Sequence, residues 1–155
     1  MKLNLGCGRY PIKDFVNIDI SGYCKPDKVW DIEWGFPWLE DNTVEYIFTS
    51  HTLEHVNKDK FIHVMNECWR VLENGGHLEI VVPSGNNLER AWRDPTHKNL
   101  FFQGSFLYFC RHGKDLPPKE DYGIEAEFER VLYVETADPQ GNALDIHITL
   151  QKVVV

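Results

Sequence analysis

Short apolar runs separated by polar turns recur along the chain, and they predict seven β-strands. Runs without strict alternation are typical of strands that are covered on both faces of a sheet. The strands are expected at Lys2–Leu5, Val16–Ile20, Lys28–Ile32, Glu45–Thr49, His77–Pro83, Glu129–Thr136 and Ala143–Val153. The last two are joined by a short turn with Asp-Pro and Gly-Asn pairs, which predicts an antiparallel hairpin.

One long helix is predicted from Lys58 to Leu72, because Phe61, Met65, Cys68 and Leu72 recur at the spacing of one buried stripe. Asn57 can cap its first turn. A shorter helix is expected over Ser105–Arg111, followed by a mobile surface loop over Gly113–Gly123.

The link between the first two strands is short. Ten residues separate Leu5 from Val16, whereas a parallel crossover usually needs about a dozen or more and contains a helix. We therefore expect a reduced form of the doubly wound sheet, with thin helical cover on one face.

A glycine turn and a carboxylate follow the first two strands. Gly6-Cys7-Gly8 follows the first strand directly, and Asp19 ends the second strand 11 residues after Gly8. Glycines let the backbone approach a ligand closely, and a carboxylate can accept hydrogen bonds from both ribose hydroxyls. The pattern predicts a site for an adenosine-containing ligand at the carboxyl ends of the strands. The alternative is a purely structural turn, capped by Asp19.

The segment Leu3–Gly8 resembles the first motif of class I S-adenosylmethionine-dependent methyltransferases. Further segments resemble the same family in the same order, and the resemblance covers nearly the whole chain. They are residues 31–32, 36–45, 51–56, 69–76 (similar to the family's "RVLKPGG" passage), 81–83 and 94–97. The segment 94–97 and the short first link resemble a short subgroup of predicted methyltransferases. The resemblance implies an α/β, reduced Rossmann-like domain over residues 1–155, with a mainly parallel seven-stranded sheet and an antiparallel last strand.

The resemblance also implies S-adenosylmethionine as cofactor and assigns its contacts. The methionine end would be lined by Gly6, Cys7 and Gly8. The ribose would be held by Asp19, while Ile20 would pack against the adenine and Asp31 and Ile32 would bind the adenine edge. The sulfonium and the substrate would be faced by Ser50 and His51. Other interpretations stay open: Asp31 as a solvated strand end, and Cys7 as a small residue that fits the turn. Trp30, Trp34, Phe36 and Trp38 are candidates for a pocket wall or for the core.

The reaction implied is methyl transfer to a small or polar acceptor, by in-line displacement at the methyl carbon. His97, His51 and Asp94 are candidates for accepting a proton from the acceptor, with His97 slightly favoured. The alternative is that all three are ordinary loop residues without a catalytic role. A non-catalytic subunit or regulator that binds S-adenosylmethionine or S-adenosylhomocysteine is the alternative for the whole protein.

His51-Thr52-Leu53-Glu54-His55 also matches the H-x-x-E-H pattern of one zinc metalloprotease class. That chemistry needs both histidines on one helical face. Here the motif follows a predicted strand directly, so no metal is expected and zinc hydrolysis remains the weaker hypothesis.

Composition narrows the partners and the compartment. A net charge of −8, from 24 acidic and 16 basic residues, argues against a nucleic-acid substrate. A small-molecule or glycan-like acceptor is what the family resemblance implies. No apolar run reaches the roughly 18 residues that cross a bilayer. The four scattered cysteines favour a reducing, cytoplasmic environment. The sequence leaves the oligomeric state open.

Overall fold

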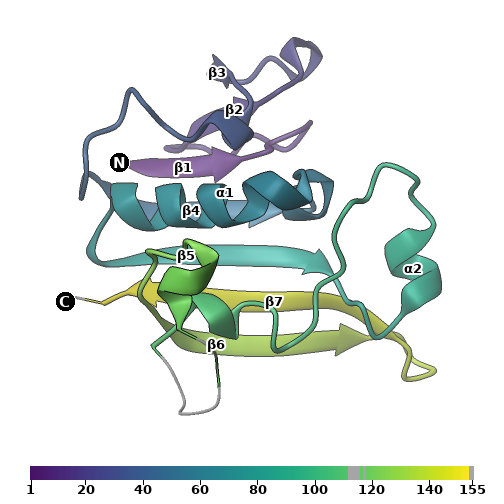
Figure 1. Ribbon diagram of the computed structural model, residues 1–155. Coiled ribbons are helices and arrows are strands. Elements are labelled where there is room, and N and C mark those ends of the chain that lie inside the picture. Colours follow the sequence, from purple (N-terminus) through teal and green to yellow (C-terminus); the bar gives the residue numbers. More distant parts are fainter. Residues whose placement is uncertain (112–115, 117, 154–155) are drawn as a thin grey trace.

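Seven strands form one sheet in the computed structural model, which describes residues 1–111, 116 and 118–153 (Figure 1). The sheet order is β3-β2-β1-β4-β5-β7-β6. The strands are β1 (Lys2–Leu5), β2 (Val16–Asp19), β3 (Lys28–Val29), β4 (Val44–Ser50), β5 (Leu72–Pro83), β6 (Phe128–Ala137) and β7 (Ala143–Lys152). Among these strands β7 alone is antiparallel, and it pairs with β5 and β6. The predicted mainly parallel α/β sheet is confirmed.

The strand order places a topological switch at β1. The chain moves outward from β1 to β2 and β3, and then returns to the other side of β1 as β4. The carboxyl ends of these parallel strands meet at one edge of the sheet, where the arrowheads of β1 and β5 point in Figure 1. Ligands of open α/β sheets bind at this edge, beside the switch point.

The helix α1 (Lys58–Val71) connects β4 to β5 and buries Val64, Met65, Cys68 and Val71. It ends one residue before the predicted end, because Leu72 already pairs with Val44 in the sheet. The next paired residues are His77 and Tyr46, so residues 73–76 bulge out of the ladder. Gly75 adopts φ = 81° there, a conformation that glycine takes at little cost.

Some local predictions were wrong in detail, and one short helix was missed. The third strand is two residues long, because Asp31 caps the 3₁₀ turn η2 (Ile32–Trp34) by accepting from the Glu33 amide. The side chain of Asn57 makes no capping hydrogen bond. The helix expected over Ser105–Arg111 is only the 3₁₀ turn η4 (Leu107–Phe109), and the helix α2 (Leu88–Trp92) was not predicted.

The predicted loop over Gly113–Gly123 falls partly outside the described residues, which omit 112–115 and 117. Its last part is ordered into the 3₁₀ turn η5 (Lys119–Tyr122). Lys119 is buried, and its ammonium group donates to the Ala126 carbonyl and to the Glu127 carboxylate. This part of the loop is therefore fixed to the body of the protein.

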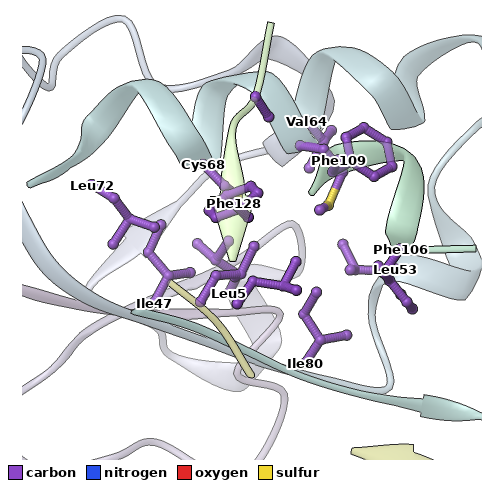
Figure 2. Close-up of a cluster of buried hydrophobic side chains, with 14 of the residues drawn as sticks. Leu5, Ile47, Leu53, Val64, Cys68, Leu72, Ile80, Phe106, Phe109 and Phe128 are labelled. Carbon is purple, nitrogen blue, oxygen red and sulfur yellow. The ribbon is translucent and has the colours of Figure 1, made fainter. Parts of the chain in front are cut away.

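The hydrophobic core lies on the α1 side of the sheet (Figure 2). Leu5, Ile47 and Ile80 from the strands meet Val64 and Cys68 from α1. Phe106, Phe109 and Phe128 close the cluster. The link between β1 and β2 contains no helix, as the short spacing predicted, so the opposite face has less helical cover. In the described part of the chain, no helix is long and apolar enough to cross a membrane.

Candidate functional site

The turn after β1 and the end of β2 are held together by Asp19. Its carboxylate accepts from the Gly8 amide at 2.8 Å and from the Ser21 amide at 2.8 Å. A carboxylate offers about four acceptor positions, so roughly two remain for a ligand. Gly6 and Gly8 adopt φ = 66° and 50°, which allows the backbone to turn sharply at this point.

These residues line a cavity of about 410 Å³ at the carboxyl edge of the sheet. Its volume lies within the range of about 300–1,000 Å³ that is typical of small-molecule sites. Seven of the nine predicted cofactor residues line it: Gly6, Gly8, Asp19, Ile20, Asp31, Ile32 and His51. Cys7 and Ser50 are not part of its wall. Cys7 is buried, and burial raises the pKa of its thiol, which disfavours a nucleophilic thiolate.

Other wall residues were not predicted as cofactor contacts, although Glu33 and Thr52 directly follow predicted ones in the sequence. Thr52 packs against Gly6, where a Cβ would come within 2.0 Å of the Thr52 hydroxyl oxygen. Glu33 accepts from the backbone and side-chain amides of Asn57, at 2.6 and 2.8 Å. Of the four aromatic candidates, Trp30 lines the cavity and Phe36 belongs to the core. The remaining wall residues are His55, Val56 and Lys98.

A second, smaller cavity of about 230 Å³ brings together the three catalytic candidates His51, Asp94 and His97. His51 also lines the first cavity, so it stands at the boundary between the two. It directly follows β4 and adopts φ = 52°, a left-handed conformation that is uncommon for a non-glycine residue. Strained residues of this kind concentrate at functional sites. The second cavity is also lined by Glu54, His55, Pro83, Arg90 and Arg93.

The polar groups in this second cavity are closely packed. His51 Nδ1 lies 3.4 Å from Glu54 Oε1, and this interaction raises the pKa of His51. Glu54 is 1% exposed, and its two oxygens lack a well-formed hydrogen bond in the described part of the chain. Asp94 accepts from the Thr96 hydroxyl and amide, which lowers the pKa of the Asp94 carboxyl.

The H-x-x-E-H motif does not form the zinc site of a metalloprotease. His51 has left-handed backbone angles, and the following residues form the 3₁₀ turn η3 (Leu53–His55). The metalloprotease site needs both histidines one turn apart on an α-helix. His51 and His55 therefore do not present their rings as that chemistry requires.

In a comparison with known protein families, residues 29–80 match a family model described as a methyltransferase domain. Several solved structures match nearly the whole chain. One is a SAM-dependent methyltransferase from Archaeoglobus fulgidus, with 16% identity and a TM-score of 0.73, covering 97% of this chain and 85% of that one. The search of curated proteins found no match.

Two further neighbours carry more specific titles. The 1,6-didemethyltoxoflavin-N1-methyltransferase of Burkholderia thailandensis was solved with bound 1,6-didemethyltoxoflavin and S-adenosylhomocysteine. It has 10% identity and a TM-score of 0.63, and the match covers 99% of this chain and 71% of that one. The putative methyltransferase in a complex with the Haloferax volcanii Trm112 activator has 12% identity and a TM-score of 0.68; the match covers 99% of this chain and 82% of that one. At these identities the likeness is one of fold.

Proposed function

Because the chain has the class I methyltransferase fold, we propose that it binds S-adenosylmethionine and transfers its methyl group to a small, polar acceptor. One observation carries the proposal: Asp19 and Asp31 meet the Gly6 and Gly8 turn around one cavity at the switch point of the sheet. Carboxylates at these strand ends suit an adenosine group and a cationic sulfonium.

In this proposal the free acceptor positions of Asp19 bind the two ribose hydroxyls. Ile20 is exposed beside them and covers the adenine ring, whose amino group donates to Asp31. Gly8 lines the cavity, and nothing stands within 4 Å of the place that a Cβ would take, so there is room for the methionine end to pass beside it. Cys7 and Ser50 lie outside the cavity wall. They support the site only through the backbone, Cys7 between Gly6 and Gly8 and Ser50 directly before His51.

The acceptor occupies the second cavity, and His51 is the residue best placed to take its proton. His51 touches both cavities, so it can face the acceptor atom that attacks the methyl group. The new bond to carbon forms as the carbon–sulfur bond breaks, and alignment of the two lowers the barrier. Asp94 and His97 line the acceptor side and orient it. The cavity's small volume and polar walls support a small-molecule or glycan-like acceptor.

The experiment is a transfer assay with methyl-labelled S-adenosylmethionine against metabolite and glycan pools. His97→Ala should leave S-adenosylhomocysteine affinity nearly unchanged, because His97 does not line the first cavity. It should lower turnover by a factor of about 10², because the acceptor loses a group that orients it. His63→Gln, on the exposed side of α1, serves as the control and should match the parent protein.

Two outcomes would contradict parts of the proposal. An equal loss of cofactor binding and turnover in His97→Ala would place His97 on the cofactor side. Tight cofactor binding without transfer to any acceptor in a broad pool would favour the non-catalytic binding subunit.

A further inference from the structure

Glu54, His55 and His97 gather beside the second cavity in an arrangement that the methyl-transfer proposal does not explain. One oxygen of Glu54 and one ring nitrogen of each histidine lie within 4.8 Å of one another. The two imidazole rings pack edge to face, with 4.7 Å between their centroids. We propose that these three side chains bind a divalent transition-metal ion, with open positions that face the second cavity.

The buried carboxylate is the first argument for a cation. Glu54 is 1% exposed, and neither of its oxygens has a well-formed hydrogen bond in the described part of the chain. The nearest ring nitrogens are His51 Nδ1 at 3.4 Å and His97 Nε2 at 4.0 Å, both long for a hydrogen bond. A buried carboxylate without partners is costly, and a coordinated cation removes that cost.

The hydrogen bonds of His97 provide the second argument. His97 Nδ1 lies 2.6 Å from the Ala91 carbonyl oxygen, which can only accept, so Nδ1 carries the proton. The lone pair of the neutral ring is then on Nε2, on the side of Glu54 and Asp94. Histidines that bind metals commonly donate their other ring N–H to a backbone carbonyl in this way.

The same reasoning fixes the tautomer of His55. The Thr96 hydroxyl lies 2.7 Å from Asp94 Oδ1 and 3.0 Å from His55 Nδ1. Asp94 is ionised and accepts, so the hydroxyl donates to Asp94 and accepts from His55 Nδ1–H. The lone pair of His55 is therefore on Nε2 as well. In each ring a partner outside the cluster binds Nδ1, which leaves Nε2 available to the ion.

Two imidazole nitrogens and one carboxylate oxygen suit zinc, iron, cobalt or manganese in the divalent state. In a tetrahedral site, bonds of about 2.0–2.2 Å place the ligand atoms about 3.4 Å apart, so the cluster must contract around the ion. Three protein ligands leave positions open, as in catalytic metal sites. Asp94 Oδ2, 3.7 Å from His97 Nε2 and half-exposed, is available as a fourth ligand.

The use of such an ion rests on the proposed function, whereas the site itself does not. In methyl transfer the ion would bind an acceptor oxygen and lower the pKa of its hydroxyl. The proton passes to His51, the oxygen forms its bond to the methyl carbon, and the sulfonium leaves as neutral S-adenosylhomocysteine. The acceptor class is then a compound whose hydroxyl oxygen can reach the ion.

The test is a calorimetric titration of the untagged, chelator-treated full chain with Zn²⁺ and with Co²⁺, which also gives a visible spectrum. We expect one ion per chain, with micromolar or tighter affinity. Glu54→Gln and His55→Gln should each weaken binding at least tenfold, because each removes a ligand. His63→Gln, which changes an exposed histidine of α1, should bind as the parent does.

A folding control separates loss of a ligand from loss of structure. Metal-free Glu54→Gln should melt at or above the temperature of the metal-free parent, because the buried charge is gone, and added Zn²⁺ should no longer raise it. Absence of saturable binding to the parent, or unchanged affinity in Glu54→Gln, would overturn the metal site. The proposed function is judged separately, since S-adenosylhomocysteine binding by the metal-free parent does not depend on the ion.

Discussion

At the scale of single residues, the two glycines of the turn after β1 have different constraints. Both have positive φ, but a Cβ on Gly6 would collide with Thr52, whereas a Cβ on Gly8 meets nothing within 4 Å. Gly6→Ala should therefore destabilise the protein by at least about 2 kcal/mol, through strain and collision together. Thermal and denaturant unfolding of the variant would measure this loss.

Gly8→Ala should act mainly on the ligand. The strain should cost about 1 kcal/mol of stability, while the methyl group should weaken S-adenosylhomocysteine binding at least tenfold by occupying the cavity. The matched control is Gly141→Ala in the β6–β7 turn, where φ is 85° and a Cβ also meets nothing within 4 Å. Equal affinity in the Gly8 and Gly141 variants would show that Gly8 does not face the cofactor.

The sequence predicted the residues at strand ends better than those brought in by tertiary contacts. Asp19 could be predicted because it closes a short apolar run beside the glycine turn, and parallel strands bring such ends together. Asp31 was assigned through the family resemblance. Glu54 could not be assigned, because its burial depends on the non-helical turn that follows His51. Lys98 and Thr52 belong to the wall because of packing between distant segments, for which a single sequence carries little signal.

At the scale of elements, the Glu67–Arg70 ion pair of α1 binds the segment that follows η2. Glu67 accepts from the Phe36 amide at 2.7 Å and pairs with Arg70, whose guanidinium also donates to the Phe36 and Leu39 carbonyls. The Arg70 hydrogen bond lowers the pKa of Glu67. Because the pKa of Glu67 is lower in the folded protein, the ionised carboxylate contributes its full stabilisation above the unfolded pKa of 4.5. This stabilisation is lost as the pH falls through the pKa of the folded state.

Glu67→Gln should therefore reduce the free energy of unfolding by about 1–3 kcal/mol at pH 7, because hydrogen bonds to a charged group are lost. The difference from the parent should shrink below about pH 4, where Glu67 becomes protonated in both states. Urea unfolding of both proteins between pH 3 and 7 would measure it. A difference that stays constant across this range would mean that the ion pair contributes nothing through its charge.

The elements themselves show which sequence signals are reliable. The long apolar stripe of α1 and the apolar positions of β7 predicted both elements to within one residue. The third strand and the Ser105–Arg111 helix were overextended, because Asp31 begins a turn of its own and the aromatic residues after Ser105 pack into the core in a 3₁₀ turn. Short elements have few repeats of their period, so local turn chemistry and tertiary packing decide their length.

At the scale of the whole molecule, the first cavity is walled by the turn after β1, the end of β2, η2 and the segment that leads into α1. A ligand that contacts all of them stabilises the folded state by mass action. S-adenosylhomocysteine at 100 times its Kd should add about 2.7 kcal/mol of stability, which corresponds to a rise of roughly 5–10 °C in Tm for a chain of this size. A thermal scan with increasing ligand would measure the rise, with NAD as the control that should leave Tm unchanged.

The most direct test of the central claim is a calorimetric titration of S-adenosylhomocysteine into the parent protein, Asp19→Ala and Asp27→Ala. Asp27 accepts hydrogen bonds from the backbone and side-chain amides of Asn17, which lies on β2 with Asp19. Asp27 itself lies outside the cavity, so the Asp27→Ala variant measures the effect of damage to β2 without loss of a ligand contact. We predict micromolar binding to the parent, a loss of about 2 kcal/mol or more in Asp19→Ala, and nearly parental affinity in folded Asp27→Ala. Absence of heat with the parent, or equal affinity in all three proteins, would contradict the account.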